Sequence, residues 1–341
     1  MQLQGLATGI GSLPHKESSA ALDLIFKYAP NIPFWPQLPK RDFREGMLAQ
    51  FSENLPCITI KQNDVVFDSS QSETELERFY DRIIARDVDY FEISREYSQG
   101  FSDFYERLKK NDLREVEYLK GHITGPFTFA ASLVNEQGVA LLHDEVFMQV
   151  IVKGLAMKAL WQVEKLRKFG KKIIIFFDEP YLGCFGSAYT PVTKEAVVTG
   201  LEELVSTIKS GDVLTGVHCC GNTDWSIFTD VQNLDIINFD AFGFFDKLSL
   251  FSEDLKKFFS RDGILCWGIV PTQDFSLETT SSMLLQRIEA GKKALAGRGI
   301  NKAAVERNLL VSPSCGLGTL DPGKSEQIFR CLSEISSALK P

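Results

Sequence analysis

The sequence alternates short apolar runs with longer segments in which apolar residues have helical spacing, and this alternation constrains the fold most. Runs that are almost entirely apolar, such as 172–177, are typical of parallel strands buried on both faces. The predicted strands cover residues 5–12, 90–93, 118–124, 172–177, 214–220, 234–239, 264–269 and 309–312. The predicted helices cover residues 17–28, 73–86, 101–110, 144–169, 194–209, 223–229, 252–259, 277–295 and 323–339. This order predicts an α/β fold, a single-domain (β/α)8 TIM barrel over residues 1–341, with an open doubly wound sheet as the alternative.

Residues 31–68, after the first predicted helix, are too long for an ordinary loop and are rich in proline. Within them, 57–61 and 65–68 are two short strand-like runs joined by the turn residues 62–64, which predicts a hairpin. We expect 31–68 to be an insertion that covers one end of the barrel as a lid, with Trp35 as a candidate residue for closing it.

Polar and glycine-rich residues follow the predicted strands, and active sites of these barrels lie at that carboxyl end. His218 and Cys220 end one strand, and residues two apart in a strand point to the same face. Zinc prefers imidazole nitrogen and thiolate sulfur, so this pair could form half of a zinc site, with Cys315 as the third ligand. Asp240 is a candidate fourth ligand or, alternatively, an acceptor that orients His218. A buried cysteine can also be a plain hydrophobic residue, which is the competing interpretation.

Composition excludes several other classes of protein. The chain has 341 residues, a net charge of −8 and a pI of about 5.2, so we expect no general affinity for nucleic acid or anionic membranes. No apolar run approaches the roughly 18 residues of a membrane span, and the first residues lack the pattern of a secretory signal. The seven scattered cysteines do not suggest a disulfide framework. These features predict a cytoplasmic protein.

Four stretches, in this order along the chain, resemble the catalytic barrel of cobalamin-independent methionine synthase. They are Ile10-Gly11-Ser12-Leu13-Pro14, Asp178-Glu179-Pro180, His218-Cys219-Cys220 and Ser314-Cys315-Gly316-Leu317. The same superfamily includes uroporphyrinogen decarboxylase and the zinc methylcorrinoid:thiol methyltransferases, and residues 218–222 and 125–128 are also similar to the latter branch. The resemblance is specific as a combination, although each stretch alone is short.

The resemblance implies a zinc-dependent methyltransferase that acts on a thiol, most simply homocysteine, to give methionine. It implies that Asp178 is a catalytic and substrate-binding residue that takes the substrate ammonium group, and that the region of Ser12 takes the carboxylate. Glu92, with Glu96 as its competitor, is a candidate second ammonium ligand.

The departures from the resembled family concern the methyl donor. The full synthase has an additional N-terminal barrel without a counterpart here, and Ser132 stands near the position of a tryptophan that is associated with the folate. We therefore expect a methylcorrinoid, carried on its own protein, to be the donor. The alternatives are methyl transfer to another thiol such as coenzyme M, a decarboxylase-like barrel, or a zinc-stabilised binding protein without catalysis.

Overall fold

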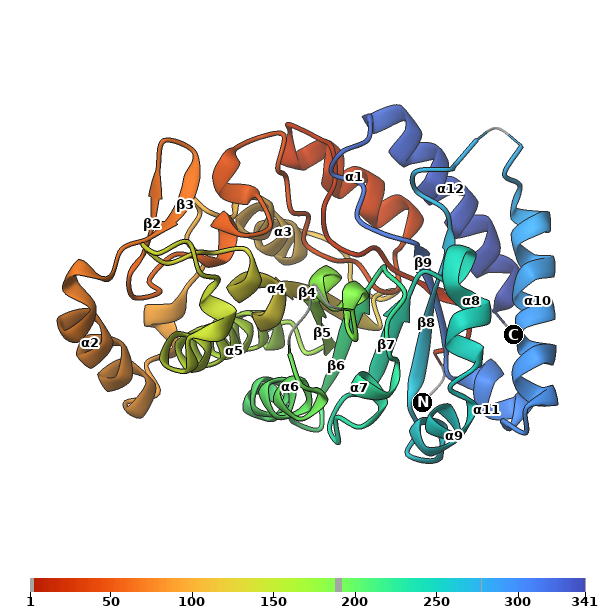
Figure 1. The fold of residues 1–341 in the computed structure, drawn as a ribbon. Helices are drawn as coiled ribbons and strands as arrows, with labels where there is room; N and C mark the ends of the chain where they lie inside the picture. Colours follow the sequence, from red (N-terminus) through yellow and green to blue (C-terminus); the bar gives the residue numbers. More distant parts are fainter. Residues whose placement is uncertain (1–2, 188–191, 277, 341) are drawn as a thin grey trace.

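The computed structural model of the chain describes residues 3–187, 192–276 and 278–340. Its centre is a parallel seven-stranded sheet in the order β1-β9-β8-β7-β6-β5-β4 (Figure 1). The strands are β1 (Leu6–Ala7), β4 (Tyr118–Thr124), β5 (Lys172–Asp178), β6 (Val213–Cys219), β7 (Ile236–Phe239), β8 (Ile264–Val270) and β9 (Leu309–Pro313). Parallel strands require crossover connections, and helices supply them, as the alternating sequence pattern predicted.

Twelve α-helices lie in the described part of the chain, and most of them surround the sheet (Figure 1). They are α1 (Ser18–Tyr28), α2 (Ser72–Ile84), α3 (Gln99–Lys110), α4 (Pro126–Ala131), α5 (Glu145–Arg167), α6 (Lys194–Ile208), α7 (Ser226–Thr229), α8 (Ala241–Ser249), α9 (Ser252–Ser260), α10 (Ser281–Gly297), α11 (Lys302–Arg307) and α12 (Pro322–Leu339). The sequence pattern did not predict α4, α8 and α11, and the expected helix start at residue 277 lies outside the described residues.

The expected strand at 90–93 is wrong, because residues Val88–Phe91 form a 3₁₀ helix, η4, that the Asp87 side chain caps. The position next to β4 belongs instead to residues 31–37. The backbone amide of Lys120 donates to the carbonyl of Pro33 (2.9 Å), and the amide of Gln37 donates to Gly11 (3.1 Å) in the segment that continues β1. Residues 31–37 thus connect the two edges of the sheet, which is compatible with a TIM-like barrel.

The prediction that all of residues 31–68 form a lid is therefore wrong in part. Phe34 and Trp35 are completely buried, so the first residues of the 31–68 stretch belong to the core. The predicted hairpin is confirmed as β2 (Ile58–Lys61) and β3 (Asp64–Phe67), whose turn residues Gln62 and Asn63 both have positive φ. That conformation matches the twist of a tight two-residue hairpin.

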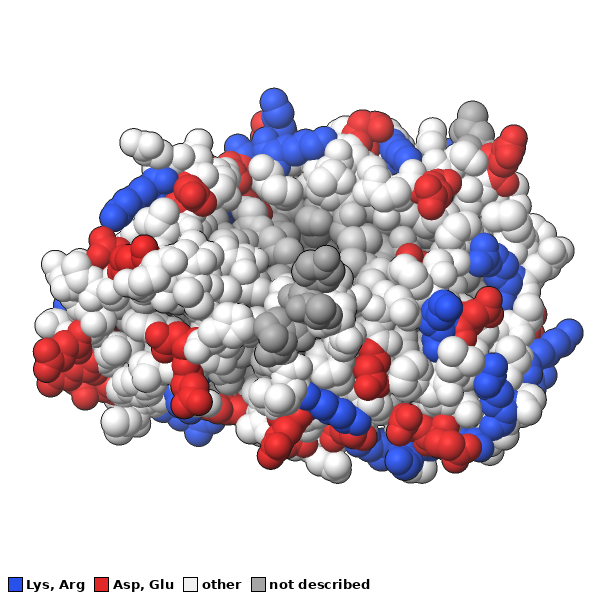
Figure 2. Space-filling model, viewed as in Figure 1, with Lys and Arg blue, Asp and Glu red and all other residues white. Residues whose placement is uncertain are grey.

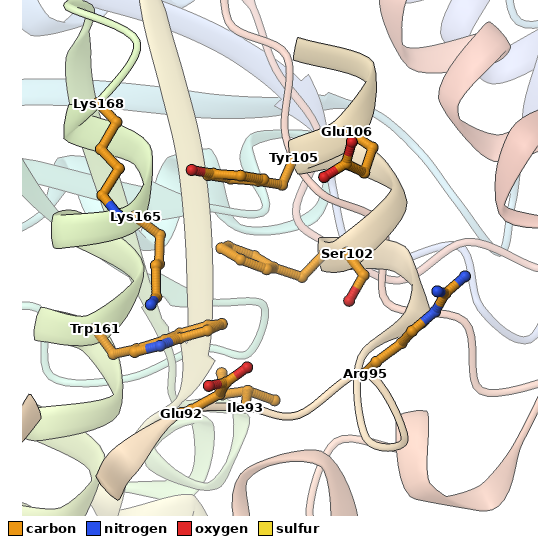
Figure 3. Close-up of a pocket in the computed structure, with 10 residues that line it drawn as sticks. Glu92, Ile93, Arg95, Ser102, Tyr105, Glu106, Trp161, Lys165 and Lys168 are labelled. Carbon is orange, nitrogen blue, oxygen red and sulfur yellow. The ribbon is translucent and has the colours of Figure 1, made fainter. Parts of the chain in front are cut away.

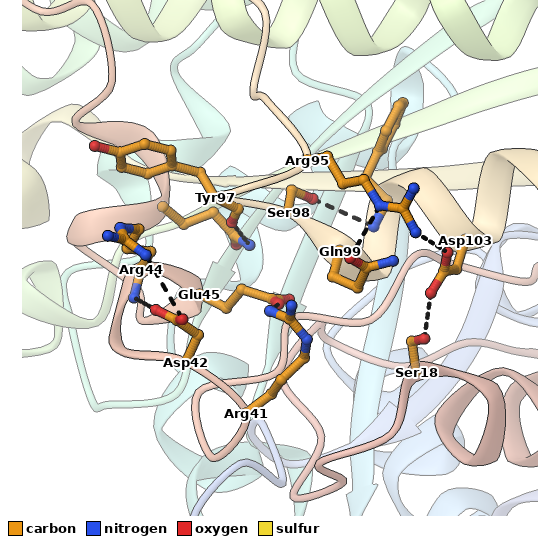
Figure 4. A network of polar contacts seen from close by, with 12 residues as sticks. Ser18, Arg41, Asp42, Arg44, Glu45, Arg95, Tyr97, Ser98, Gln99 and Asp103 are labelled. Carbon is orange, nitrogen blue, oxygen red and sulfur yellow. Dashed lines mark hydrogen bonds and ion pairs between the residues drawn. The ribbon is translucent and has the colours of Figure 1, made fainter.

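Residues 36–45, between the buried Trp35 and the hairpin, are held to the start of α3 by a polar network (Figure 4). The Arg41 guanidinium pairs with the buried Glu45 carboxylate, and Arg44 pairs with Glu96 at 3.1 Å. Gly100 lies so close to the Pro36 carbonyl that an added Cβ would be 1.9 Å from its oxygen. Residues 36–45 therefore pack firmly against the beginning of α3.

Two apolar clusters follow from the alternation of side chains along the strands. The smaller cluster lies on one face of the sheet and includes Leu6, Tyr118, Ile174, Ile236 and Leu310. The larger one lies between the sheet and the helices. Helix α5 is long and apolar enough to cross a membrane by length and composition alone. However, 78% of its apolar window is buried inside the protein, as in a core helix.

Candidate metal centre

The three predicted zinc ligands come together at the carboxyl ends of the strands. His218 lies near the end of β6, Cys220 directly follows that strand, and Cys315 follows β9. Their ligand atoms all lie within 4.8 Å of one another, and they form the only such cluster of possible metal ligands among the residues that the structure describes. One imidazole and two thiols suit a tetrahedral zinc ion that keeps one position open.

The electrostatics of this cluster favour a bound cation. Hydrogen bonding from Cys220 and the nearby His218 lower the pKa of Cys315 to about 4 despite its burial, so Cys315 is a thiolate. Cys220 keeps its proton because that thiolate raises its pKa. Burial lowers the pKa of His218, but the Cys315 thiolate and Asp178 outweigh burial and raise it. A dication that binds between these groups would displace the Cys220 proton, because a metal-bound cysteine is a thiolate.

Asp178, the predicted catalytic residue, is opposite His218 in the register of β5 and β6. Its Oδ1 atom is buried and has no hydrogen-bond partner among the described residues. Burial raises the pKa of Asp178 to about 6, while His218 and Lys120 act in the opposite direction. A buried carboxylate with an unused oxygen can accept hydrogen bonds from a substrate ammonium group.

The neighbouring Glu179 has a structural role that explains the Asp-Glu-Pro sequence. Its carboxyl group accepts hydrogen bonds from the amides of Phe127 (3.0 Å) and Thr128 (2.8 Å) at the start of α4, and from the Thr128 hydroxyl (2.7 Å). Its own amide donates to the carbonyl of His218 (2.8 Å). Glu179 thus connects β5, β6 and α4 next to the cluster, and its neighbour in the sequence is Asp178.

Ser12 lies beside the loop that carries Cys315. The amide of Leu317 donates to the carbonyl of Ser12 (2.9 Å), and an added Cβ at Gly316 would be 2.2 Å from the Ser12 hydroxyl. Only glycine fits at position 316 without displacing Ser12. Ser12 is half-buried, which leaves it available near the cluster.

The structure places the other two predicted residues differently. The Asp240 side chain accepts a hydrogen bond from the amide of Gly243 (2.8 Å) and caps α8, outside the three-residue cluster. The charges of Cys315 and His218 still affect its pKa, which burial raises. It lies near the centre, and its role as a ligand stays a prediction.

Glu92 lies in a separate pocket of about 340 Å³ between α3 and α5, with Tyr105, Trp161 and Lys168 (Figure 3). Lys168 directly follows α5, before β5 begins, whereas the metal cluster lies where the strands end. The structure therefore does not bring Glu92 together with His218 and the two cysteines.

Two buried polar residues near the cluster, Asn238 and Lys120, were not predicted from the sequence. Asn238 of β7 is completely buried and contacts His218 Nδ1 with its Oδ1 atom. Lys120 of β4 is also completely buried, donates to the Ile10 carbonyl (2.6 Å) and lies 4.3 Å from the Phe176 ring centroid. The available signal for Asn238 was a single polar residue inside an otherwise apolar strand. Lys120 gave a weaker signal, because β4 also contains His122 and Thr124.

Charged residues of both signs are mixed on the visible face of the molecule (Figure 2). Lys and Arg are interspersed with Asp and Glu on the face in Figure 2, and no broad basic area lies on that face. This distribution accords with the net charge of −8.

Comparison with known proteins gives distant similarities only. No protein family and no curated protein sequence matches the chain. A B12-independent methionine synthase from Shewanella sp. W3-18-1, solved in complex with selenomethionine, is similar with 19% identity and a TM-score of 0.47. The match covers 69% of this chain and 66% of that one, so the chain spans just under two thirds of the synthase chain. An enzyme targeting pectin rhamnogalacturonan II is similar with 12% identity and a TM-score of 0.27, over 71% and 36% of the two chains.

Proposed function

We propose that this protein is a zinc-dependent methyltransferase that transfers a methyl group to the thiol of homocysteine and so produces methionine. The observation that carries the proposal is the convergence of His218, Cys220 and Cys315 within 4.8 Å at the ends of the strands. In this proposal the sheet and residues 31–37 together form the wall of a (β/α)8 barrel, and the cluster lies at its catalytic end.

The residues present fit zinc by the chemistry of their donor atoms. His218 uses Nδ1 for its contact with Asn238, which leaves Nε2 for a metal, and Cys220 and Cys315 would supply two thiolates. A bound zinc ion would act as a Lewis acid that keeps the substrate sulfur as a thiolate at neutral pH. Asp240 would be the fourth ligand at rest and would yield its position to the substrate thiolate, and its carboxylate would also cap the start of α8.

The remaining site residues would bind the amino acid part of the substrate. Asp178 offers a buried carboxylate to the ammonium group, and Ser12 lies on the side of Cys315, where the substrate carboxylate would bind. Glu92 lies in the pocket between α3 and α5 and would take no part in binding this substrate.

For the methyl donor we propose a methylcorrinoid on a carrier protein. Ser132 ends α4 and its hydroxyl donates to the Thr128 carbonyl (2.7 Å), so it offers no aromatic face on which a pterin could stack. The substrate sulfur would form a bond to the methyl carbon while the bond from carbon to cobalt breaks. The electron pair of that bond stays with the corrinoid, and the thiol proton is released to solvent.

The test compares donors in parallel. Purified protein with zinc and homocysteine should form methionine from methylcobalamin or a methylated corrinoid protein, and little or none from methyltetrahydrofolate with one or several glutamates. Zinc analysis should give about one ion per chain, and Cys220→Ser and Cys315→Ser should lose both zinc and activity.

The outcomes separate the parts of the proposal. Turnover with the folate but not the corrinoid would refute the donor and leave the zinc–thiol chemistry intact. A wild-type protein without zinc, or with the same zinc content as Cys315→Ser, would refute the metal site itself.

A further inference from the structure

Asn238 makes three contacts that leave its amide group a single orientation. Its Nδ2 atom donates to the carbonyl of Cys266 (2.9 Å) and to the hydroxyl oxygen of Ser312 (2.8 Å). The Ser312 hydroxyl donates its own proton to the carbonyl of Pro313 (2.9 Å), so towards Asn238 it can only accept. A reversed amide would place its oxygen against the Cys266 carbonyl, which has no proton to donate.

The amide orientation determines the tautomer of His218. With Nδ2 directed at Cys266 and Ser312, the Oδ1 atom of Asn238 faces His218 Nδ1. An amide oxygen only accepts, so Nδ1 must carry the proton, and a neutral ring then has a free electron pair on Nε2. His218 and Asn238 are also opposite each other in the register of β6 and β7, so the backbone supports this contact.

We propose that Asn238 is a positioning residue that holds His218 as the Nδ1–H tautomer, with Nε2 directed to the metal. This inference rests on the zinc site of the proposed function and assigns the orienting role, which the sequence suggested for Asp240, to a different residue. Asn238 and Ser312 are completely buried, so water does not compete for these hydrogen bonds.

The neutral amide has a consequence for the charge of the site. A carboxylate at position 238 would also accept from Nδ1–H, but it would add a negative charge beside two cysteine thiolates. The amide orients the ring without that charge, which leaves the site better able to accept a third thiolate from the substrate.

The experiment measures zinc affinity and the histidine tautomer, which do not depend on methyl transfer. Competition with a chromophoric chelator should show zinc binding about 10- to 100-fold weaker in Asn238→Leu than in wild type. Nitrogen-15 NMR of the ring should show the Nδ1–H form of His218 in wild type and a mixture of tautomers in metal-free Asn238→Leu. The chain has only four histidines, which makes the assignment practicable.

Two variants keep the test decisive. Asn238→Asp retains an acceptor for Nδ1–H and should bind zinc more tightly than Asn238→Leu does. Ser312→Ala removes one partner of the amide and should cause a smaller loss, which provides the test if Asn238→Leu does not fold.

The matched control is Asn308→Leu. Asn308 is a buried asparagine whose Nδ2 donates to the Gly263 carbonyl (3.1 Å) just before β9, away from the cluster. It should leave zinc affinity unchanged. Unchanged zinc affinity and tautomer in the position 238 and 312 variants that fold would overturn the inference, whereas a wild type that binds no zinc would instead refute the proposed metal site.

Discussion

At the scale of single residues, Lys158 shows how costly an isolated charge is in this core. It lies in the middle of α5, is completely buried, and its Nζ atom has no hydrogen-bond partner within the described part of the chain. Burial lowers its pKa to about 8, and the charge of Glu53 only partly opposes this effect. An unpaired buried ammonium group favours its neutral form, because desolvation penalises the charge.

Lys158→Met should therefore stabilise the protein at pH 7, by about 1–3 kcal/mol. The ordinary pKa of 10.5 applies to the unfolded chain, so between pH 8 and 10.5 the unfolded state holds more protons at this residue than the folded state. The wild-type free energy of unfolding should consequently rise with pH across this window, and Lys158→Met should remove that contribution. Urea denaturation at several pH values measures it, with the exposed Lys257→Met as control. A variant less stable than wild type at pH 7 would contradict this account.

At the scale of secondary structure elements, the contact between Glu179, which follows β5, and the start of α4 supports the candidate metal centre. Gly125 precedes α4, and an added Cβ there would be 2.3 Å from the Glu179 carboxyl group. Three hydrogen bonds hold that carboxyl group, so it cannot move aside easily. The Glu179 amide also bonds the His218 carbonyl, and the strain would reach the ligand strand.

Gly125→Ala should lower the free energy of unfolding by about 1–3 kcal/mol and weaken zinc retention, since Glu179 has to shift. Gly297→Ala is the matched control, because no heavy atom lies within 4 Å of its added Cβ and it ends α10. That control should be neutral or slightly stabilising. Guanidinium denaturation and zinc analysis of both variants test the prediction, and equal behaviour of the two would show that the Gly125 contact is unimportant.

At the scale of the whole molecule, residues 31–37 connect the two edges of the sheet, and Trp35 anchors them. Its indole lies 3.9 Å from the His122 ring, centroid to centroid, and its Nε1 donates to the Gln162 side chain (2.9 Å). Phe101 packs edge-on against it. The residue therefore belongs to the core, whereas a lid residue would contact the substrate and leave stability largely unaffected.

Trp35→Ala should lower the free energy of unfolding by about 3–5 kcal/mol, the usual cost of removing a large buried aromatic side chain. Phe43→Ala changes an aromatic residue that is 36% exposed, elsewhere in residues 31–68, and should have an effect within about 0.5 kcal/mol. Thermal and chemical denaturation distinguish the two interpretations. A Trp35→Ala protein of wild-type stability with an altered KM would restore the lid hypothesis.

The sequence alone determined the features that depend on local pattern. Segments rich in apolar residues located β4 and β5 to β9, because most neighbouring residues of a buried parallel strand are apolar. The two-residue period placed His218 and Cys220 on one face, and the turn that follows placed them at a strand end. Cys315 could be added because parallel strands end on the same side of a sheet.

Only the tertiary structure decided which distant segments become neighbours. Residues 31–37, and not the predicted strand 90–93, lie beside β4, and Glu92 lies in another pocket than predicted. The pairing at a sheet edge depends on packing across the whole chain. The contacts of Asn238 also depend on residues that are distant in the sequence. Its amide acquires an orientation only through Cys266 and Ser312, on strands that follow it by 28 and 74 residues, and no local pattern records such a contact.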